Sequence, residues 1–224
     1  MGVKERQERE REAVARAILD AARDLFVTEG YHHVSIRKIA ERIEYSPAAI
    51  YSYFPSKDDI FFALAVEGFR LLVSAAAEPP ASDDPVDEIR AVFWKYYAFS
   101  KSHPEYFALM FIDRTVPRIS RDWHGFAAIA EMKQQIHQRI QRAIDAGAFP
   151  AGTSPHVVFR ILLTALHGAA TLRLCSRMEQ GEDGDALAHA TLEAAIQGLR
   201  AGAGVNCHLE ACADTEVRTD RHDS

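Results

Sequence analysis

The chain has 224 residues, of which 48% are hydrophobic and 9% aromatic, and its net charge is −6. This length and composition are typical of a globular protein with a sizeable core, and they exclude a disordered chain and a disulfide-stabilised miniprotein. The acidic balance argues against a protein that coats nucleic acid or an anionic membrane through its overall charge.

The first third of the chain is predicted to be helical, because apolar residues recur there at a spacing of three or four. Gly30 is expected to end the first helix, and Ser35, Ser46 and Ser56 are suitable N-caps for the next three. The run that begins at Pro79 marks a loop after the fourth helix. The predicted helices are about residues 4–28, 35–43, 46–54 and 56–77.

The rest of the chain is also predicted to be helical, with breaks at glycine and proline. These helices are expected at about residues 84–101, 104–113, 120–146, 154–178 and 185–201. No segment of useful length alternates apolar and polar residues, so the predicted fold class is all-α, a small head followed by a helical-bundle body. After residue 202 the periodicity fades, which predicts an acidic flexible tail over 203–224.

No membrane association is expected, because the longest uncharged apolar stretch of the C-terminal half, Ile161–Leu172, is shorter than the roughly 18–20 residues that span a bilayer. The first residues alternate Arg with Glu and form no secretory signal, so a cytoplasmic location is expected.

The two short helices form the pattern of a helix-turn-helix, whose second helix can enter the major groove of DNA. The sequence of this segment resembles that of the TetR family of bacterial transcriptional regulators over about residues 10–65. The residues that carry the resemblance are Ser35, Ile39-Ala40, Ser46, Tyr51, Tyr53-Phe54 and Ser56-Lys57. The resemblance implies a DNA-binding head over residues 1–56 and a body over 57–202 that binds a small effector and dimerises.

Glu44 departs from the family pattern, which often has glycine at this turn. If the position requires a positive φ, a residue with a side chain costs about 1 kcal/mol there. A carboxylate at this turn is also unfavourable close to phosphates.

Side chains of residues 35–57 divide into two groups by the DNA contacts that they can make. The first group is expected to contact phosphates through hydrogen bonds or positive charge, which fixes the register of the protein on DNA without reading the base sequence. Its members are Ser35, Arg37, Lys38, Tyr51, Tyr53 and Lys57. Contacts to bases are expected from Tyr45, Ser46, Pro47, Ala48 and Ser52. No Arg, Lys, Asn or Gln lies between Tyr45 and Phe54, so we expect sequence preference to come partly from Tyr45, Ser52 and DNA shape.

The body is rich in aromatic residues. Those at helical spacing are expected to form core, but helical bundles also place ligand cavities between helices. Candidate ligand contacts are Phe93, Tyr97, Phe107, Met110, Phe111, Trp123, Phe126, Met132, His137, Leu163 and His167. The two histidines lie on apolar faces, a pattern that favours a hydrogen-bonded core role over a ligand contact. An anionic group of the ligand could meet Arg114, Arg118 or Arg121.

The TetR resemblance implies a dimer through the last two long helices, residues 154–178 and 185–201. A small apolar stripe on the first of them suits either a partner or the internal core: Val158, Leu162, Ala165, Ala169 and Leu172. A dimer also matches the symmetry of a palindromic operator.

The predicted function is a ligand-responsive transcriptional regulator, most simply a repressor that a lipophilic or aromatic effector releases from DNA. Two alternatives remain open: an activator of the same family, and a metal or redox sensor that uses Cys207, His208 and Cys212. The sequence lacks the zinc-protease, nucleophile-elbow and phosphate-loop motifs, so neither an enzyme nor a cofactor is expected.

Overall fold

The computed structural model describes residues 2–76, 82, 84–117, 127–203 and 205. All regular secondary structure within these ranges is helical, which confirms the all-α fold class. The α-helices are α1 (Val3–Glu29), α2 (Ile36–Arg42), α3 (Pro47–Tyr51), α4 (Lys57–Ala76), α5 (Pro85–Ser102), α6 (Pro104–Phe107), α7 (Ala127–Asp145), α8 (Pro155–Leu174) and α9 (Gly184–Arg200). A 3-10 turn, η1 (Tyr31–His33), follows α1, and a π-helical turn, η2 (Ala108–Ile112), follows α6.

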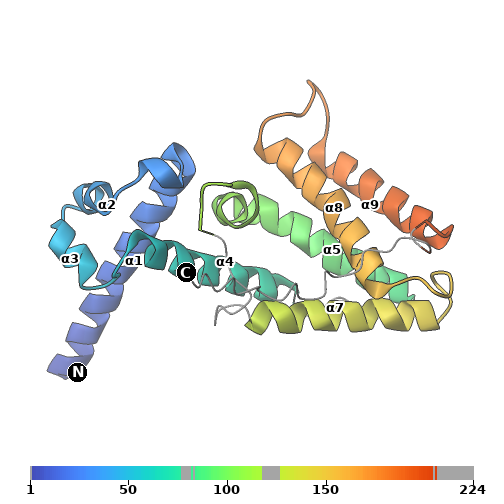
Figure 1. The fold of residues 1–224 in the computed structure, drawn as a ribbon, viewed down its shortest axis with the longest axis horizontal. Helices are drawn as coiled ribbons and strands as arrows, with labels where there is room; N and C mark the ends of the chain where they lie inside the picture. Colours follow the sequence, from blue (N-terminus) through green and yellow to red (C-terminus); the bar gives the residue numbers. More distant parts are fainter. Residues whose placement is uncertain (1, 77–81, 83, 118–126, 204, 206–224) are drawn as a thin grey trace, which may run out of the picture.

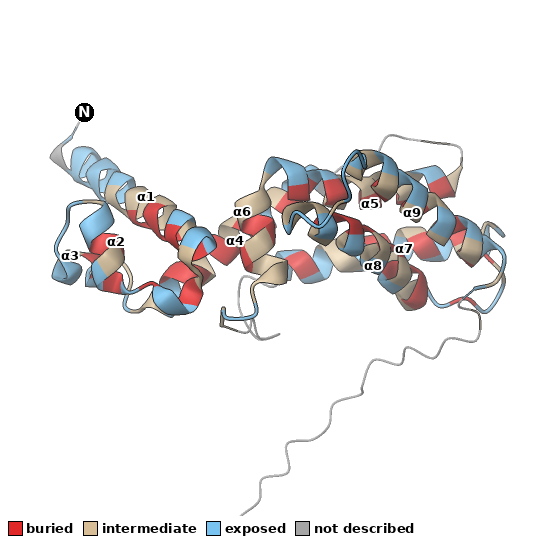
Figure 2. Ribbon diagram, turned by 90° about the horizontal axis from the view of Figure 1, so that it is seen from above, coloured by how far each residue is buried: buried red, intermediate tan, exposed pale blue. Residues whose placement is uncertain are grey.

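The molecule is elongated, with α1, α2 and α3 at one end and α5, α7, α8 and α9 at the other (Figure 1). Helix α4 runs from the head into the body and belongs to both. Buried residues line the inner face of α1, and they continue along α4 into the bundle (Figure 2). A single buried core therefore extends from the head through the body.

The head folds as its capping residues predict. The Ser35 Oγ accepts a hydrogen bond from the backbone N–H of Lys38, and the Ser46 Oγ accepts one from that of Ala49, each at 3.2 Å. Gly30 ends α1 with φ +82°. Inside the head, the apolar faces of the helices contribute side chains that are at most 8% exposed, among them Ile18, Phe26, Ile36, Ile39 and Ile50.

Glu44 adopts a left-handed conformation, with φ +60°, in the turn between α2 and α3. The backbone N–H of Tyr45 donates to the carbonyl of Ala40 at 2.9 Å, and that of Glu44 donates to Glu41 at 3.3 Å. These two bonds form a Schellman motif, in which the left-handed residue satisfies carbonyls at the helix end. The expected positive φ at Glu44 is confirmed.

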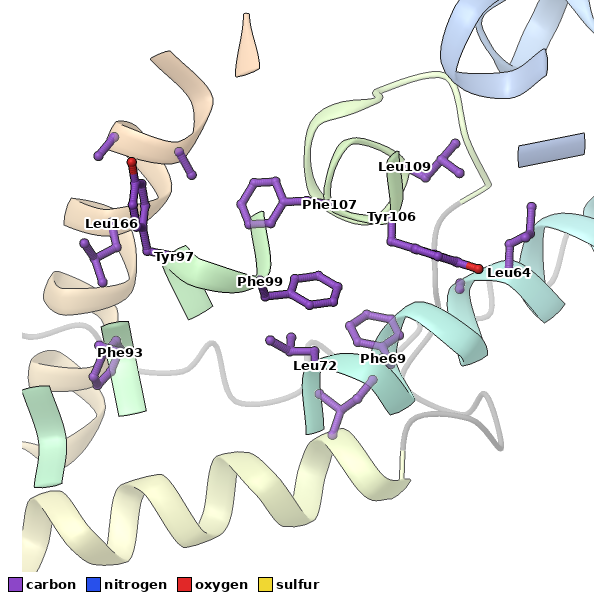
Figure 3. Packing of buried hydrophobic residues seen from close by; sticks show 14 of the residues in the cluster. Leu64, Phe69, Leu72, Phe93, Tyr97, Phe99, Tyr106, Phe107, Leu109 and Leu166 are labelled. Carbon is purple, nitrogen blue, oxygen red and sulfur yellow. The ribbon is translucent and has the colours of Figure 1, made fainter. Parts of the chain in front are cut away.

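In the body, side chains of α4, α5, the α6–η2 segment and α8 meet in a core rich in aromatic rings (Figure 3). Tyr97, Phe99 and Phe107 are at most 1% exposed. The predicted helix over 104–113 is in fact a short α-helix followed by the π-helical turn η2, which ends at Ile112. The start of the helix predicted from residue 120 lies outside the described residues.

Helix α8 ends at Leu174, four residues before its predicted end, because Ser176 takes a left-handed conformation with φ +52°. By length and composition alone α8 would suffice to cross a membrane, a test that the core helix of a bundle also passes. Its apolar residues pack against neighbouring helices of the bundle. Val158, Leu162 and Ala169 of the predicted partner stripe are buried within the protomer, so they belong to its core.

Candidate nucleic-acid interface and ligand cavity

The helix-turn-helix exposes the turn before α3 and the outer face of α3 itself. Tyr45 is 44% exposed and Tyr51 is 54% exposed. Two phenol rings that are six residues apart in the sequence are therefore accessible to solvent. The exposed residues of this face are Tyr45, Ser46, Pro47, Ala48, Tyr51 and Ser52. All five residues expected to contact bases are therefore accessible.

The serine hydroxyls of the head already make local hydrogen bonds. Ser35 and Ser46 use their oxygens as caps, so their hydroxyl protons remain available to donate to a phosphate. Ser52 instead donates its proton to the carbonyl of Ala49 at 2.7 Å, so its oxygen is left to accept a bond from a base.

The cations expected to contact phosphates are not equally available. Arg37 is 81% exposed and pairs with Glu41 at 2.9 Å, a surface ion pair weak enough to be exchanged for a phosphate. Lys38 forms an ion pair with Glu29 of α1. Each of these predicted DNA contacts therefore competes with a carboxylate of the head.

Lys57 has a structural role that the sequence did not reveal. Its Nζ donates to the carbonyls of Tyr31 and Val34 at 2.9 and 3.0 Å and lies 4.0 Å from the centroid of the Tyr31 ring. An ammonium group has three N–H bonds, so one remains for a phosphate. Tyr53 is half-buried, with the guanidinium carbon of Arg11 at 5.6 Å over its ring, so it lies against α1.

Two groups of polar contacts connect α1 of the head to the body. The Nη1 of Arg16 donates to both carboxylate oxygens of Glu67 on α4, at 2.7 and 2.8 Å. Arg23 lies over the ring of Tyr106 on α6, with its guanidinium carbon 5.6 Å from the ring centroid. These contacts join α1 to α4 and to α6.

The body encloses a cavity of about 340 Å³ between α4, α5, η2, α7 and α8. Figure 3 shows part of its wall, with Phe69 and Leu72 on α4 and Phe93 on α5. The lining residues are Phe69, Leu72, Val92, Phe93, Tyr96, Met110, Phe111, Ile129, Met132, Lys133, Ile136, Phe159, Arg160 and Leu163. The volume and the apolar lining are typical of a small-molecule site.

The candidate ligand contacts fall into three groups. Five of them line the cavity: Phe93, Met110, Phe111, Met132 and Leu163. Four lie elsewhere in the body: Tyr97, Phe107, His137 and His167. Trp123 and Phe126 lie outside the described residues, as do Arg118, Arg121, Cys207, His208 and Cys212. Arg114 is exposed and does not line the cavity.

Phe107 and His167 support the cavity wall from behind. The Nδ1 of His167 lies 3.0 Å from the hydroxyl of Tyr96, and its ring lies 5.7 Å from that of Phe107. Burial lowers the pKa of His167 and raises that of Tyr96. Both shifts favour a neutral imidazole that accepts a hydrogen bond from the neutral phenol. This hydrogen bond fixes the orientation of Tyr96, whose ring is part of the lining.

Tyr97 and His137 face away from the cavity. The hydroxyl of Tyr97 donates to Asp185 of α9 at 3.1 Å, so its ring joins α5 to α9. His137 lines a neighbouring groove on α7, and burial together with the charges of His156 and Lys133 lowers its pKa. Both residues lie on apolar helix faces. Helical spacing alone does not tell which apolar residues of a helix line the cavity and which pack elsewhere.

Lys133 and Arg160 are cavity residues that the sequence analysis missed. A signal for Arg160 was present, because it is the only charged residue between Pro155 and Leu172. A single cation in such an uncharged stretch requires either a partner or contact with solvent. Lys133 follows Met132 in α7 without a comparable signal.

A helix-turn-helix head on a helical body with an apolar cavity defines a class of transcription regulator. The family model described as "Bacterial regulatory proteins, tetR family" matches residues 18–64, and that described as "Tetracyclin repressor-like, C-terminal domain" matches residues 89–195. The chain belongs to the TetR family of bacterial transcriptional regulators, as its helix-turn-helix sequence predicted. Members of this family are regulators and not enzymes.

Two curated relatives illustrate the similarity. The chain is 26% identical to the HTH-type transcriptional repressor AcnR of Corynebacterium diphtheriae over 177 residues, which is 76% of this chain and 83% of that protein. It is 39% identical to the HTH-type transcriptional repressor Rv1474c of Mycobacterium tuberculosis over 62 residues, which is 28% of this chain and 33% of that protein.

Solved structures share the fold at lower identity. The regulator PfmR of Thermus thermophilus aligns with a TM-score of 0.65 and 20% identity, over 81% of this chain and 98% of that one. FadR of Bacillus subtilis, solved in complex with stearoyl-CoA, aligns with a TM-score of 0.63 and 17% identity, over 82% and 98%. These alignments establish the arrangement of head and body.

Proposed function

We propose that the chain is a repressor that binds a palindromic operator as a homodimer and leaves it when a small apolar effector fills the cavity of the body. Residues 1–56 bind DNA, and residues 57–202 bind the effector and dimerise. Residues 203–224 form an acidic tail. The site of action is the cytoplasm, where the operator is accessible. The observation that carries the proposal is the connection of a cavity wall, through α6, to the head helix α1.

The exposed face of α3 supports operator binding. Tyr45 and Tyr51 offer hydroxyl donors and ring area, and Pro47 and Ala48 offer apolar contact to a thymine methyl group. With no long amide or cation on this face, specificity depends on hydroxyl contacts and on DNA shape. Ser35, Arg37, Lys38 and Lys57 at the edges hold the head in register on the phosphates.

The cavity wall supports effector-dependent release. Met110 and Phe111 line the cavity and belong to η2, which continues directly from α6. Tyr106 on α6 contacts Arg23 of α1. A ligand that displaces η2 therefore favours a different position of the head, and two heads so displaced no longer fit half-sites about 34–36 Å apart.

The outer faces of α8 and α9 support dimerisation. Residues exposed on α8 include Thr164, Gly168 and Leu172, and Leu172 is 40% exposed. A Cβ at Gly168 would meet no atom within 4 Å, so none of the described residues of the protomer covers this position. Helix α9, which packs along α8, exposes Ala190 and Ala194. Small residues on both helices allow close approach of a second copy.

The central experiment selects DNA bound by the full chain from a random pool and then measures affinity by fluorescence anisotropy. We expect a two-fold symmetric site, with weaker binding by Tyr45→Phe and Ser52→Ala. A guanine requirement that disappears only on substitution of Ala48 would contradict this mode of readout. A reporter in a deletion strain separates repression, in which expression rises on deletion, from activation.

The dimer is tested by sedimentation velocity. Gly168→Arg places a long cation at the centre of the exposed face of α8 and is expected to yield monomers. Gln138→Arg, at an exposed position of α7, is the matched control and should remain dimeric. A dimer that survives Gly168→Arg contradicts the proposed interface.

A further inference from the structure

The polar groups of the cavity indicate the chemical class of the effector. Eleven of its fourteen lining residues have wholly apolar side chains, and the exceptions are Tyr96, Lys133 and Arg160. Tyr96 is hydrogen-bonded to His167 behind the wall. The described lining contains two cations and no Asp or Glu, so its formal charge is positive.

Arg160 lies on α8 at a position exposed to solvent, directly after the buried residues Val157, Val158 and Phe159. Within the described part of the chain it forms no ion pair, whereas Arg16, Arg23 and Arg90 all do. A guanidinium group is suited to bidentate hydrogen bonds with a planar anion such as a carboxylate.

Lys133 lies on α7 and is half-buried. It lines the cavity and also the adjoining groove that contains His137, so it stands where the cavity opens toward the surface. The cationic residues thus lie on α7 and α8, which also contribute apolar residues to the wall, while α4, α5 and η2 contribute only apolar residues and Tyr96.

The cavity volume limits the size of the ligand. At about 30 Å³ for a water-sized group, 340 Å³ accommodates roughly eleven such groups. This corresponds to a medium-length chain or a substituted ring, and the volume lies near the lower end of the range of about 300–1,000 Å³ for ligand sites.

We propose that the effector is an amphipathic anion, with an apolar body of medium length in the cavity and a carboxylate or similar anionic group bound by Arg160 and Lys133. This inference rests on the cavity being the effector site of the proposed function. A cationic ligand would place like charges together, and a neutral one would offer the guanidinium of Arg160 no charge-assisted hydrogen bond.

The test compares three probes that share a ten-carbon chain and differ in headgroup: decanoate, 1-decanol and decyltrimethylammonium. Binding to the full-length protein is measured by isothermal titration calorimetry below the micellar range of each probe. We expect decanoate to bind at least about tenfold more tightly than decanol, as for one charge-assisted hydrogen bond, and the cation to bind least. Equal binding of decanoate and decanol, or no binding of either, overturns the proposal.

Two variants locate the anion site. Arg160→Gln and Lys133→Gln should each reduce the preference for decanoate over decanol by about tenfold, because each removes one charged donor. Arg142→Gln is the matched control on α7, since Arg142 is 67% exposed and does not line the cavity. If the control lowers the preference equally, the effect is general electrostatic attraction and the assigned site is wrong.

Operator affinity, measured in the same samples, separates this inference from the function on which it rests. Decanoate that binds with the predicted preference but leaves operator affinity unchanged supports the anion site and contradicts effector-dependent release. Release by decanol as efficient as release by decanoate supports the proposed function and contradicts the anion site.

Discussion

At the scale of single residues, four helix ends share the left-handed turn seen at Glu44. The equivalent positions after α7, α8 and α9 are Gly147, Ser176 and Gly202, with φ of +78°, +52° and +96°. After each of them, the backbone N–H of the next residue donates a hydrogen bond to a carbonyl in the last turn of the helix, as in a Schellman motif. Glycine adopts this conformation at little cost, whereas Glu44 and Ser176 adopt it against a steric penalty.

Replacing Glu44 with glycine should therefore stabilise the protein. We expect Glu44→Gly to raise the free energy of unfolding by about 1 kcal/mol, because the steric penalty exceeds the added entropy of the unfolded chain. The measurement is equilibrium urea unfolding. Glu44→Ala removes the carboxylate and keeps the Cβ, so an equal gain in that variant would show that charge, and not backbone strain, is the cause.

Two half-buried histidines of the body make stability dependent on pH. Burial is the main cause that lowers the pKa of His137 and of His167 below the ordinary value of 6.5. Below that pH the unfolded chain binds protons that the folded chain does not, so stability is full above about pH 7 and falls as pH decreases through about 6.5. Each histidine contributes a slope of at most about 1.4 kcal/mol per pH unit.

The corresponding variant is His137→Leu, because the Nε2 of His137 is buried and has no hydrogen-bond partner among the described residues. Unfolding free energies between pH 5 and 8 should show a shallower slope for this variant. His32→Leu, at an exposed site, serves as the control. An unchanged slope in His137→Leu would show that the acid sensitivity comes from other groups.

At the scale of secondary-structure elements, the contact between α4 and the α6–η2 segment depends on Gly68. A Cβ at this position would overlap the Sδ of Met110 and would stand 3.0 Å from the Cδ1 of Tyr106. The methionine can rotate into the cavity, but the tyrosine ring can move only if α6 moves. The close packing of this segment on α4 therefore needs glycine at this position.

We expect Gly68→Ala to destabilise the protein by about 1–3 kcal/mol, since the overpacking exceeds the gain of about 1 kcal/mol in helix propensity. Gly198→Ala on α9 is the control, because its Cβ would find its nearest neighbour, Ala203 Cβ, at 3.8 Å. The control should be neutral or stabilising in urea unfolding. Equal free energies of unfolding for the two variants would show that a Cβ at residue 68 is not crowded by Met110 and Tyr106.

Helix boundaries were predictable where a local signal marks them, and not elsewhere. Ser35 and Ser46 cap α2 and α3 as expected, because an N-cap acts through its own hydroxyl. The end of α8 was placed four residues too late, since Ser176 turns left-handed with no glycine or proline to signal it. The π-helical turn η2 has no signature in composition either, because its geometry results from packing.

The exposed residues of the helix-turn-helix were predictable as a group because they lie within one short motif, and their DNA contacts stay a prediction. The sequence predicted that the helical body contains a ligand cavity, but it did not predict the full set of lining residues. Met110, Phe111 and Met132 do line it, but Tyr97 and Phe107 are equally apolar and point into other parts of the core. Which face of a body helix meets the cavity depends on packing between distant segments, which no local pattern encodes.

At the scale of the whole molecule, the Arg16–Glu67 contact joins head and body. A double-mutant cycle with Arg16→Gln and Glu67→Gln should give a coupling energy of about 0.5–1 kcal/mol, because the side chains are 41% and 32% exposed and water screens the pair. The coupling should decrease with added salt. The Arg6–Glu10 pair within α1, 78% and 63% exposed, is the control and should couple less. A coupling energy of zero for Arg16 and Glu67 would mean that this ion pair does not stabilise the junction of head and body.

No residue of α1, α2 or α3 lines the cavity, and no residue of the cavity lies on the exposed face of α3. Under the proposed function, substitutions in the lining would alter which molecule is detected while the operator stays the same, and substitutions on α3 would redirect the protein to other genes while its chemical sensitivity is kept. The two specificities would then be separable. Only the few residues that join them, such as Gly68, Tyr106 and Arg23, are constrained by both.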